Sequence, residues 1–208
     1  MQYKEDQFTC ADGDQLFFRN WIPPEAPLAV LIIIHGLSDH SGRYQSIVVN
    51  LVPRRIAIYS FDQRSHGRSP GQHGHIDSFS MDAGIDNTGL SRDPDVVQTF
   101  LDDPLCHGKG TPRLATELSK AVADTNANAA RFQPPLLITH GTGDHMTDPE
   151  ASHSFYENAA STNKAYIAYE GGYHEGHNDI HRERVIIDIA QWLEEQIRVI
   201  TRQPEKSE

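Results

Sequence analysis

The hydrophobic pattern opens with a hairpin and then alternates short apolar runs with amphipathic stretches. Asp12-Gly13 lies between two patterned stretches and favours a hairpin turn, because glycine adopts positive φ without steric cost. Residues 28–34 and 56–61 are apolar without alternation, which indicates parallel strands covered on both faces. Between them, apolar residues recur at helical spacing, namely Tyr44, Ile47, Val48, Leu51 and Val52. Residues 28–61 therefore predict one β-α-β unit.

The second half of the chain continues this alternation after an irregular stretch, 62–93, in which no clear strand or helix is visible. Asp93-Pro94, Thr111-Pro112 and Asp148-Pro149 each combine an N-cap residue with proline at the first helical position, and so predict helix starts. Strands are expected at 136–139 and 164–169, and a long amphipathic helix at 182–200. Residues expected to face inward are Leu114, Leu118 and Val122 in the second helix, and Val185, Ile189, Leu193, Ile197 and Ile200 in the last. Strands alternating with helices predict an α/β sandwich.

Composition narrows the class of protein without naming a function. The 208 residues suffice for one large domain or two small ones, and 38% are apolar. A net charge of −11 repels phosphate backbones, so nucleic acid is excluded as an expected partner. No apolar run is long enough for a transmembrane helix, and the charged first residues do not resemble a signal peptide. Two cysteines, Cys10 and Cys106, form no disulfide framework, so we expect a cytoplasmic protein.

Chemically active side chains follow the predicted strands. Asp144 comes after the strand at 136–139, and His174 comes after the strand at 164–169. In α/β sheets, functional groups gather beyond the carboxyl ends of the strands. An acid followed by a histidine matches the last two members of a Ser…Asp…His triad, in which the carboxylate orients the imidazole and the imidazole takes the serine proton.

Several motifs together resemble the monoacylglycerol lipase branch of the α/β-hydrolases. They are HGLSDHSGRY (35–44), FDQRSHGRSPG (61–71), GHIDSF (74–79), LSRDPDVV (90–97), HGTGDHMTDP (140–149) and EGGYHE (170–175). The resemblance implies a three-layer α/β-hydrolase-like sandwich that hydrolyses a fatty-acid ester of glycerol through an acyl-serine, without a cofactor. It also implies that Asp144 is the triad acid, His174 the base, and the backbone N–H of Leu37 one of two oxyanion donors.

The nucleophile elbow of that family is absent. A strand ending in Gly-x-Ser-x-Gly should lie between GHIDSF and LSRDP, but only Ser80 to Gly89 separates those motifs. At roughly 30 residues per β-α unit, about 60 residues are missing. Gly67-Arg68-Ser69-Pro70-Gly71 matches the motif literally, yet its strand ends too early and Pro70 disfavours helical geometry at Ser69. Ser69 is therefore a weak candidate, and the nucleophile stays unknown. Ser65 replaces a glycine usual in the family, at a cost of about 1 kcal/mol if the turn needs positive φ.

Three interpretations stay open. The chain is an impaired or inactive carboxylic ester hydrolase of the monoacylglycerol lipase or lysophospholipase type, a truncated non-catalytic remnant or incomplete gene product, or a zinc-dependent hydrolase. The zinc alternative rests on His73-x-His75-x-Asp77 and on the later group His174, His177 and His181. A zinc site needs three or four converging ligands. No metal is expected, because the lipase resemblance already accounts for the GHID segment.

The missing segment has consequences for the fold. We expect a single incomplete domain at 1–202, with a lid remnant at about 80–130 and a disordered tail at 203–208. The missing strands belong to the centre of the sheet, so either the His35 and Asp144 strands pair directly or two open edges are left. Open apolar edges favour self-association. The other expected partners are a monoacylglycerol-like lipid ester and, peripherally, a membrane.

Overall fold

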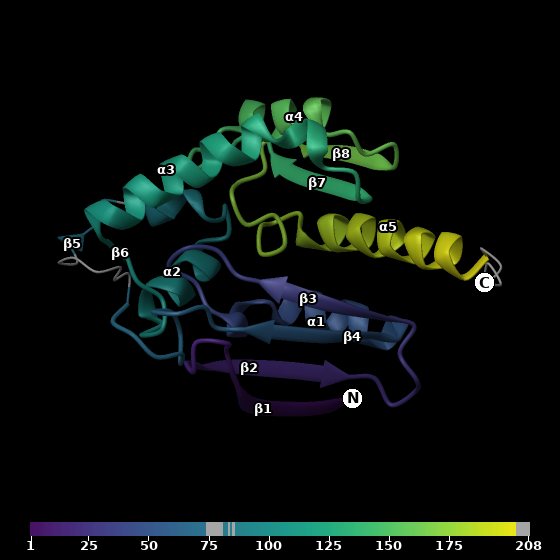
Figure 1. The fold of residues 1–208 in the computed structure, drawn as a ribbon, viewed down its shortest axis with the longest axis horizontal. Helices are drawn as coiled ribbons and strands as arrows, with labels where there is room; N and C mark the ends of the chain where they lie inside the picture. Colours follow the sequence, from purple (N-terminus) through teal and green to yellow (C-terminus); the bar gives the residue numbers. More distant parts are fainter. Residues whose placement is uncertain (74–80, 83, 85, 203–208) are drawn as a thin grey trace.

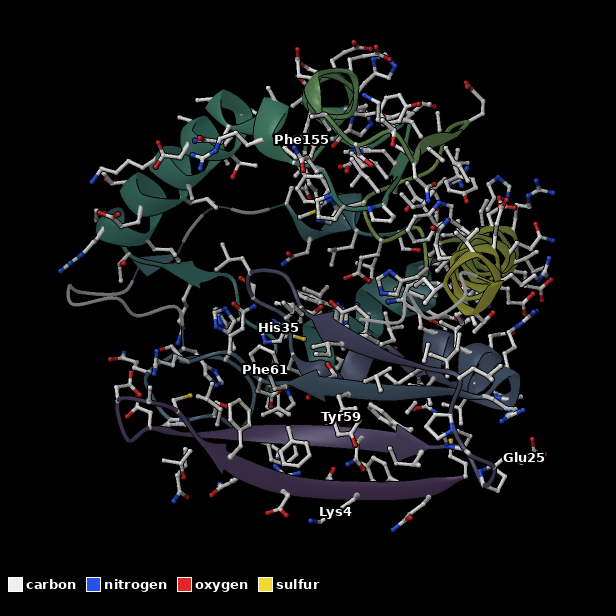
Figure 2. All side chains as sticks on the ribbon, turned by 45° about the vertical axis from the view of Figure 1, so that its right-hand side comes forward. Lys4, Glu25, His35, Tyr59, Phe61 and Phe155 are labelled. Atoms are coloured by element: carbon white, nitrogen blue, oxygen red, sulfur yellow. The ribbon has the colours of Figure 1, made fainter. Side chains whose placement is uncertain are left out.

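The first half of the chain forms a four-stranded sheet that begins with the predicted hairpin. The computed structural model describes residues 1–73, 81–82, 84 and 86–202; the predicted disordered tail lies outside them. β1 (Gln2–Thr9) pairs antiparallel with β2 (Gln15–Ile22), and Gly13 in the turn has φ +95°. The strand order is β1-β2-β4-β3 (Figure 1). Phe18 stacks on Tyr59, and Phe8 meets Phe61 edge-on, so aromatic rings join the hairpin to β4 (Figure 2).

The predicted β-α-β unit is confirmed. β3 (Ala29–Ile34) pairs parallel with β4 (Ile56–Phe61), and the connection contains η1 (Ser41–Arg43), α1 (Gln45–Leu51) and η2 (Val52–Arg54). The main hydrophobic cluster lies between this sheet, α1 and the last helix. Its buried members are Trp21, Ile33, Val48, Leu51, Val52, Ile56, Ile58 and Ala190. The face of the sheet that carries Trp21, Ile33 and Ile58 is therefore covered by helices.

The second half forms its own two-stranded parallel sheet. β7 (Leu136–Gly141) pairs with β8 (Lys164–Tyr169), and α4 (Pro149–Asn158) connects them. α5 (Arg182–Arg202) follows β8 and packs against α1 and β7. No helix among the described residues has the length and apolar character needed to span a bilayer. The predicted inward face of α5 is confirmed at Val185, which is buried, but Ile200 is 71% exposed at the end of the helix.

The two sheets do not join, which settles the alternative that the sequence left open. β3 and β7 each end their sheet, so two open parallel edges remain (Figure 1). Along β3, Ile33 is buried under α1 and α5, whereas Val30, Ile32 and Ile34 on the opposite face are 59%, 62% and 66% exposed. A strand with apolar residues on both faces is typical of a sheet covered on both sides. The cover on one side is missing here.

The segment between β4 and β7 contains mostly short elements and one long helix. β5 (Met81–Asp82) pairs with β6 (Lys109–Gly110), and η3 (Asn87–Gly89) precedes α2 (Pro94–Asp102). α3 (Pro112–Ala127) is followed by η4 (Ala129–Arg131). The helix starts at Pro94 and Pro112 are confirmed by side-chain caps from Asp93 and Thr111.

The predicted inward face of α3 is wrong. The helix has no buried residue, and Leu118 and Val122 are 50% and 52% exposed. Helical periodicity identifies which face is apolar, but burial also requires a layer for that face to pack on. α3 packs mainly on η4 and runs apart from the four-stranded sheet (Figure 1).

Candidate active site

Asp144 lies in the loop that follows β7, directly beside the loop that follows β8. Gly141 makes this approach possible, because any side chain there would collide with the carbonyl of Gly172. The N–H of Gly143 donates to the same carbonyl at 2.9 Å and ties the two loops together. The sequence therefore places glycines where two backbones touch, and the acid and the histidine are carried on the touching loops.

The Asp144 carboxylate is buried and receives five hydrogen bonds. Oδ1 accepts from the backbone N–H groups of Met146 at 2.7 Å and Thr147 at 3.0 Å. Oδ2 accepts from the Thr147 hydroxyl at 2.7 Å, His174 Nδ1 at 2.9 Å and His140 Nε2 at 3.0 Å. Burial alone would raise the pKa of Asp144, but these hydrogen bonds, with that from His174 the largest, hold the pKa at about 2. The carboxylate is thus charged at any pH near neutrality.

His174 is held by Asp144 through one ring nitrogen. Because an ionised carboxylate only accepts hydrogen bonds, Nδ1 carries the proton and Nε2 holds a lone pair. The side chain is 34% exposed and borders a cavity of about 580 Å³. Leu37 lines the same cavity, together with Phe100, Leu118 and Met146. The three residues for which the sequence predicts roles (Asp144, His174 and Leu37) are therefore brought to one place.

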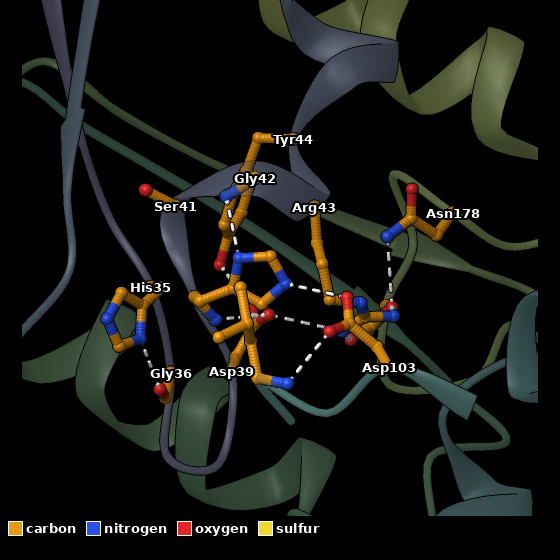
Figure 3. A network of polar contacts seen from close by, with 12 residues as sticks. His35, Gly36, Asp39, Ser41, Gly42, Arg43, Tyr44, Asp103 and Asn178 are labelled. Carbon is orange, nitrogen blue, oxygen red and sulfur yellow. Dashed lines mark hydrogen bonds and ion pairs between the residues drawn. The ribbon is translucent and has the colours of Figure 1, made fainter. Parts of the chain in front are cut away.

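A buried polar network positions the loop of Leu37 against the loop of His174 (Figure 3). Arg43 forms two hydrogen bonds to Glu175, at 2.6 and 2.8 Å, and a third to Asp39 at 3.3 Å. The Tyr44 hydroxyl donates to Asp39 at 2.9 Å. The side chains of Arg43 and Glu175 are each 9% exposed. This ion pair is a direct polar link between the first and second halves of the chain.

Ser69 is not brought to the histidine. Its hydroxyl donates to the carbonyl of Asp62 at 2.5 Å and accepts from the N–H of Phe17 at 2.9 Å, so it joins the hairpin to the turn after β4. The serine is 6% exposed. The neighbouring expectation for Ser65 is confirmed, since this residue has φ +61°. The literal Gly-x-Ser-x-Gly match therefore lies in a structural turn.

Sequence reasoning missed three residues around Asp144. His140, on β7, donates to the carboxylate, and its other nitrogen Nδ1 lies 2.8 Å from the hydroxyl of Ser152 on α4. Thr147 contacts both Asp144 and His174. His140 and Thr147 belong to the motif HGTGDHMTDP (140–149), in which the sequence predicted a role for Asp144 alone. Ser152 had no sequence signal, because its link to His140 depends on how α4 packs on β7.

The histidines of the zinc alternative are held apart by other contacts. His174 is bound to Asp144, whereas the ring of His177 stacks on Tyr44 with centroids 5.1 Å apart. The Nε2 atom of His73 donates to the carbonyl of Gly67 at 3.2 Å. His75 and Asp77 lie outside the described residues.

One group in the described part of the chain has metal-ligand geometry, namely His40, Asp103 and Cys106. The ring of His40 is already committed, however. Its Nδ1 accepts from the N–H of Gly42 at 3.1 Å, so Nε2 carries the proton and donates it to Asp103 at 2.9 Å. Binding a metal through Nε2 would displace that proton and break the contact to Gly42. The arrangement is that of a hydrogen-bonded turn.

Comparisons with known proteins identify the family of the chain. The chain matches the family described as serine aminopeptidase S33 in two pieces, residues 25–83 and 80–181. It is 26% identical to an uncharacterised abhydrolase domain-containing protein of Dictyostelium discoideum, over 90% of this chain and 28% of that protein's length. It is 22% identical to the monoacylglycerol lipase of Mycolicibacterium smegmatis, over 91% of this chain and 96% of the lipase. Both alignments span 269 positions, more than the 208 residues of this chain, so over 60 positions have no counterpart here.

The comparison with solved structures identifies the fold. A soluble variant of the monoglyceride lipase of Saccharomyces cerevisiae, solved with a substrate analogue, superposes with a TM-score of 0.82 at 17% identity. The superposition covers 94% of this chain and 97% of that one, so both sheets take their places in one hydrolase fold. The two family matches meet at residues 80–83, where the elbow segment is missing. The chain thus belongs to the serine aminopeptidase S33 family of α/β-hydrolases, in its monoacylglycerol lipase-like branch, and lacks the segment of the nucleophile elbow.

Proposed function

We propose that this chain binds monoacylglycerol-like carboxylic esters at a site that has kept the acid and base of its family and lost the family's nucleophile. The observation that carries the proposal is the 2.9 Å contact between Asp144 and His174 beside a cavity of about 580 Å³. Ligand pockets of this size accommodate small lipids. The lining residues Leu90, Phe100 and Leu118 are apolar and suit an acyl chain.

The roles of the individual groups follow from their positions. His174 would take a proton through Nε2, Asp144 would stabilise the resulting imidazolium, and the N–H of Leu37 would bind the developing oxyanion. Without the elbow serine, no acyl-enzyme forms by the family's route. In a serine hydrolase, loss of the nucleophile alone costs on the order of 10⁶ in turnover. We therefore infer that hydrolysis of monoacylglycerol is impaired.

The domain division belongs to the same proposal. We propose a single incomplete hydrolase domain at 1–202, in which residues of about 80–130 are the remnant of the lid. The exposed apolar side of α3, with Leu118 bordering the cavity, supports this assignment. Peripheral contact of this region with a membrane stays a prediction.

A non-catalytic remnant or an incomplete gene product is the second candidate. The absence of more than 60 positions present in relatives favours it. The DNA around codons 78–90 separates the two forms of this alternative, because an intervening coding segment with an elbow motif would mean that the sequence is incomplete. Without such a segment, binding measurements decide between an ester-binding site and a remnant.

The binding test uses a monoacylglycerol analogue with an ether in place of the ester. We expect saturable binding by calorimetry, and at least a tenfold weaker affinity in Leu118→Arg, because a guanidinium would replace an apolar side chain at the part of the cavity proposed to hold the acyl chain. Val122→Arg is the matched control. It lies one turn further along α3, is equally exposed and does not line the cavity. Absence of binding in the unmodified protein, or equal effects of the two substitutions, would refute the proposal.

A further inference from the structure

Asp144 serves two histidines, and the second of them completes a relay that ends in a serine. Ser152 on α4 lies 2.8 Å from His140 Nδ1, and His140 Nε2 lies 3.0 Å from Asp144 Oδ2. The three residues come from three elements: α4, β7 and the loop after β7. A nucleophile within hydrogen-bond reach of a base, with the base oriented by a third group, is the arrangement of an activated nucleophile.

The direction of the hydrogen bonds follows from the acid. Because the Asp144 carboxylate can only accept, His140 Nε2 must carry the proton. Nδ1 of the neutral ring then holds a lone pair, so the hydroxyl of Ser152 donates to it. This is the protonation state in which a histidine can remove the serine proton. His140 is a buried base, with its side chain 10% exposed, and Ser152 is partly exposed.

The position of the serine is fixed by the packing of α4. Asp148 caps the helix through the N–H of Glu150 at 3.0 Å, and the hydroxyl of Tyr166 on β8 donates to the carbonyl of Pro149 at 3.3 Å. Ser152 lies in the next turn, on the side of α4 that faces β7. The geometry is therefore set by the scaffold, as a preorganised nucleophile requires.

We propose that Ser152, His140 and Asp144 form a substitute nucleophilic relay that acts on short-acyl or aryl carboxylic esters. The inference rests on the proposed function only in its use of Asp144 as the acid. Ser152 is partly exposed and does not line the cavity of about 580 Å³ beside His174, so an ester would reach it from the surface of α4, without an acyl-binding cavity.

The reaction is an ordinary acyl transfer. The Ser152 oxygen forms a bond to the ester carbonyl carbon while its proton passes to His140 Nδ1. The bond from that carbon to the alcohol oxygen then breaks, and His140 returns the proton to the departing alcohol. Water then loses a proton to the same nitrogen as its oxygen bonds to the acyl carbon. The bond from that carbon to the Ser152 oxygen breaks, the carboxylic acid leaves, and His140 returns the proton to the serine.

The first test is covalent labelling of the whole chain with a fluorophosphonate probe, followed by peptide mass spectrometry. We expect the label on Ser152, and a loss of at least tenfold in labelling rate in Ser152→Ala and in His140→Ala. Ser154→Ala is the matched control, because this serine is exposed on the same helix and we expect unchanged labelling. No label, or label on another serine that persists in Ser152→Ala, would overturn the inference.

A second test separates a base from a structural partner. In Ser152→Cys, His140 should promote thiolate formation, so alkylation by iodoacetamide should extend at least one pH unit lower than in Ser154→Cys. The difference should vanish when His140→Ala is added. Equal pH profiles for the two thiols would overturn the relay. Binding of the ether analogue is measured in a separate experiment. A negative result for Ser152 therefore leaves the proposed ester-binding cavity standing, and absence of binding leaves the relay of Ser152, His140 and Asp144 standing.

Discussion

The Asp144 carboxylate determines the chemistry of its surroundings through hydrogen bonds alone. It sets the tautomers of both His140 and His174, because each donates a ring N–H to the same oxygen. Its pKa of about 2 means that this role is lost only in strong acid. Two imidazoles that share one acid differ in what their other nitrogen faces: a cavity for His174 and Ser152 for His140.

A second group of histidines lies in a row near the turn after β4. The ring centroids of His35 and His66 are 5.2 Å apart, those of His66 and His107 are 5.1 Å apart, and those of His107 and His73 are 5.2 Å apart. Burial, followed by repulsion from His66 and His73, lowers the pKa of His107 to about 4. Burial also lowers the pKa of His66. The Nε2 atoms of both His66 and His107 are buried and have no hydrogen-bond partner among the residues that the structure describes.

These lowered pKa values predict an acid-sensitive fold. The folded state keeps His107 neutral, whereas the unfolded chain protonates it at its ordinary pKa of 6.5. The contribution of this residue to stability is therefore complete above pH 6.5 and is lost as the pH drops towards 4. We expect the urea unfolding free energy to fall less steeply over this range in His107→Gln, which cannot be protonated.

His153→Gln is the control for the pH measurement, because that side chain is 48% exposed. It should retain the pH slope of the unmodified protein. A slope in His107→Gln equal to that of the unmodified protein would contradict the assignment.

At the scale of the elements, polar contacts between loops hold the two sheets together, because no strand pairing joins them. β3 and β7 share no hydrogen bonds, so the loops after β3 and β8 are joined by the Arg43–Glu175 pair. Burial raises the pKa of Glu175, but the contacts with Arg43 outweigh it and the pKa is lowered. Phe100 of α2 lies under the guanidinium, 4.7 Å away, and links α2 to the same pair.

Removing one partner of this pair should weaken the fold strongly. Arg43→Ala leaves the buried Glu175 carboxylate without its main partner, and breaking a buried pair typically costs about 3–5 kcal/mol. Arg54→Ala is the control, because the Arg54–Glu194 pair is 38% and 31% exposed and its loss should cost less than about 1 kcal/mol. Denaturant unfolding measures both, and similar losses in the two variants would show that the buried pair does not join the halves.

At the scale of the whole molecule, the two edge strands of the four-stranded sheet, β1 and β3, differ in how well they are protected against pairing with another chain. β1 carries Lys4, Glu5 and Asp6, and charges of this kind discourage pairing with another chain. β3 carries no charge, because in a complete hydrolase it lies inside the sheet. Its apolar side chains Val30, Ile32 and Ile34 are mostly exposed. The loss of the central segment has thus turned an interior strand into an edge.

We therefore expect the protein to self-associate through β3. Sedimentation velocity should show dimers or larger species that increase with concentration, and Ile32→Lys should shift them towards monomer. Val49→Lys, on α1, replaces an apolar residue of similar exposure (52%) away from the edge and should leave association unchanged. A monomer at all concentrations in the unmodified protein would rule out association by this edge.

Much of the architecture could be predicted because it depends on local patterns. β4 spans the predicted residues 56–61, and the helix starts at Pro94, Pro112 and Pro149 follow from capping residues and proline. The proximity of Asp144 and His174 could be expected because both follow strands of one sheet direction. Ser152 could not, because a serine on a helix carries no signal until the helix is packed on its strand.

The sequence by itself determined the order of strands and helices and the absence of the elbow, because these depend on local patterns, and it predicted the Asp144–His174 pair because both residues follow parallel strands. Only the tertiary structure decided that β3 and β7 stay apart, that α3 leaves Leu118 and Val122 exposed, and that His140 connects Asp144 to Ser152. The physical reason is that burial and long-range pairing depend on which surfaces meet. An apolar pattern shows that a face can be buried, but not that anything is there to bury it.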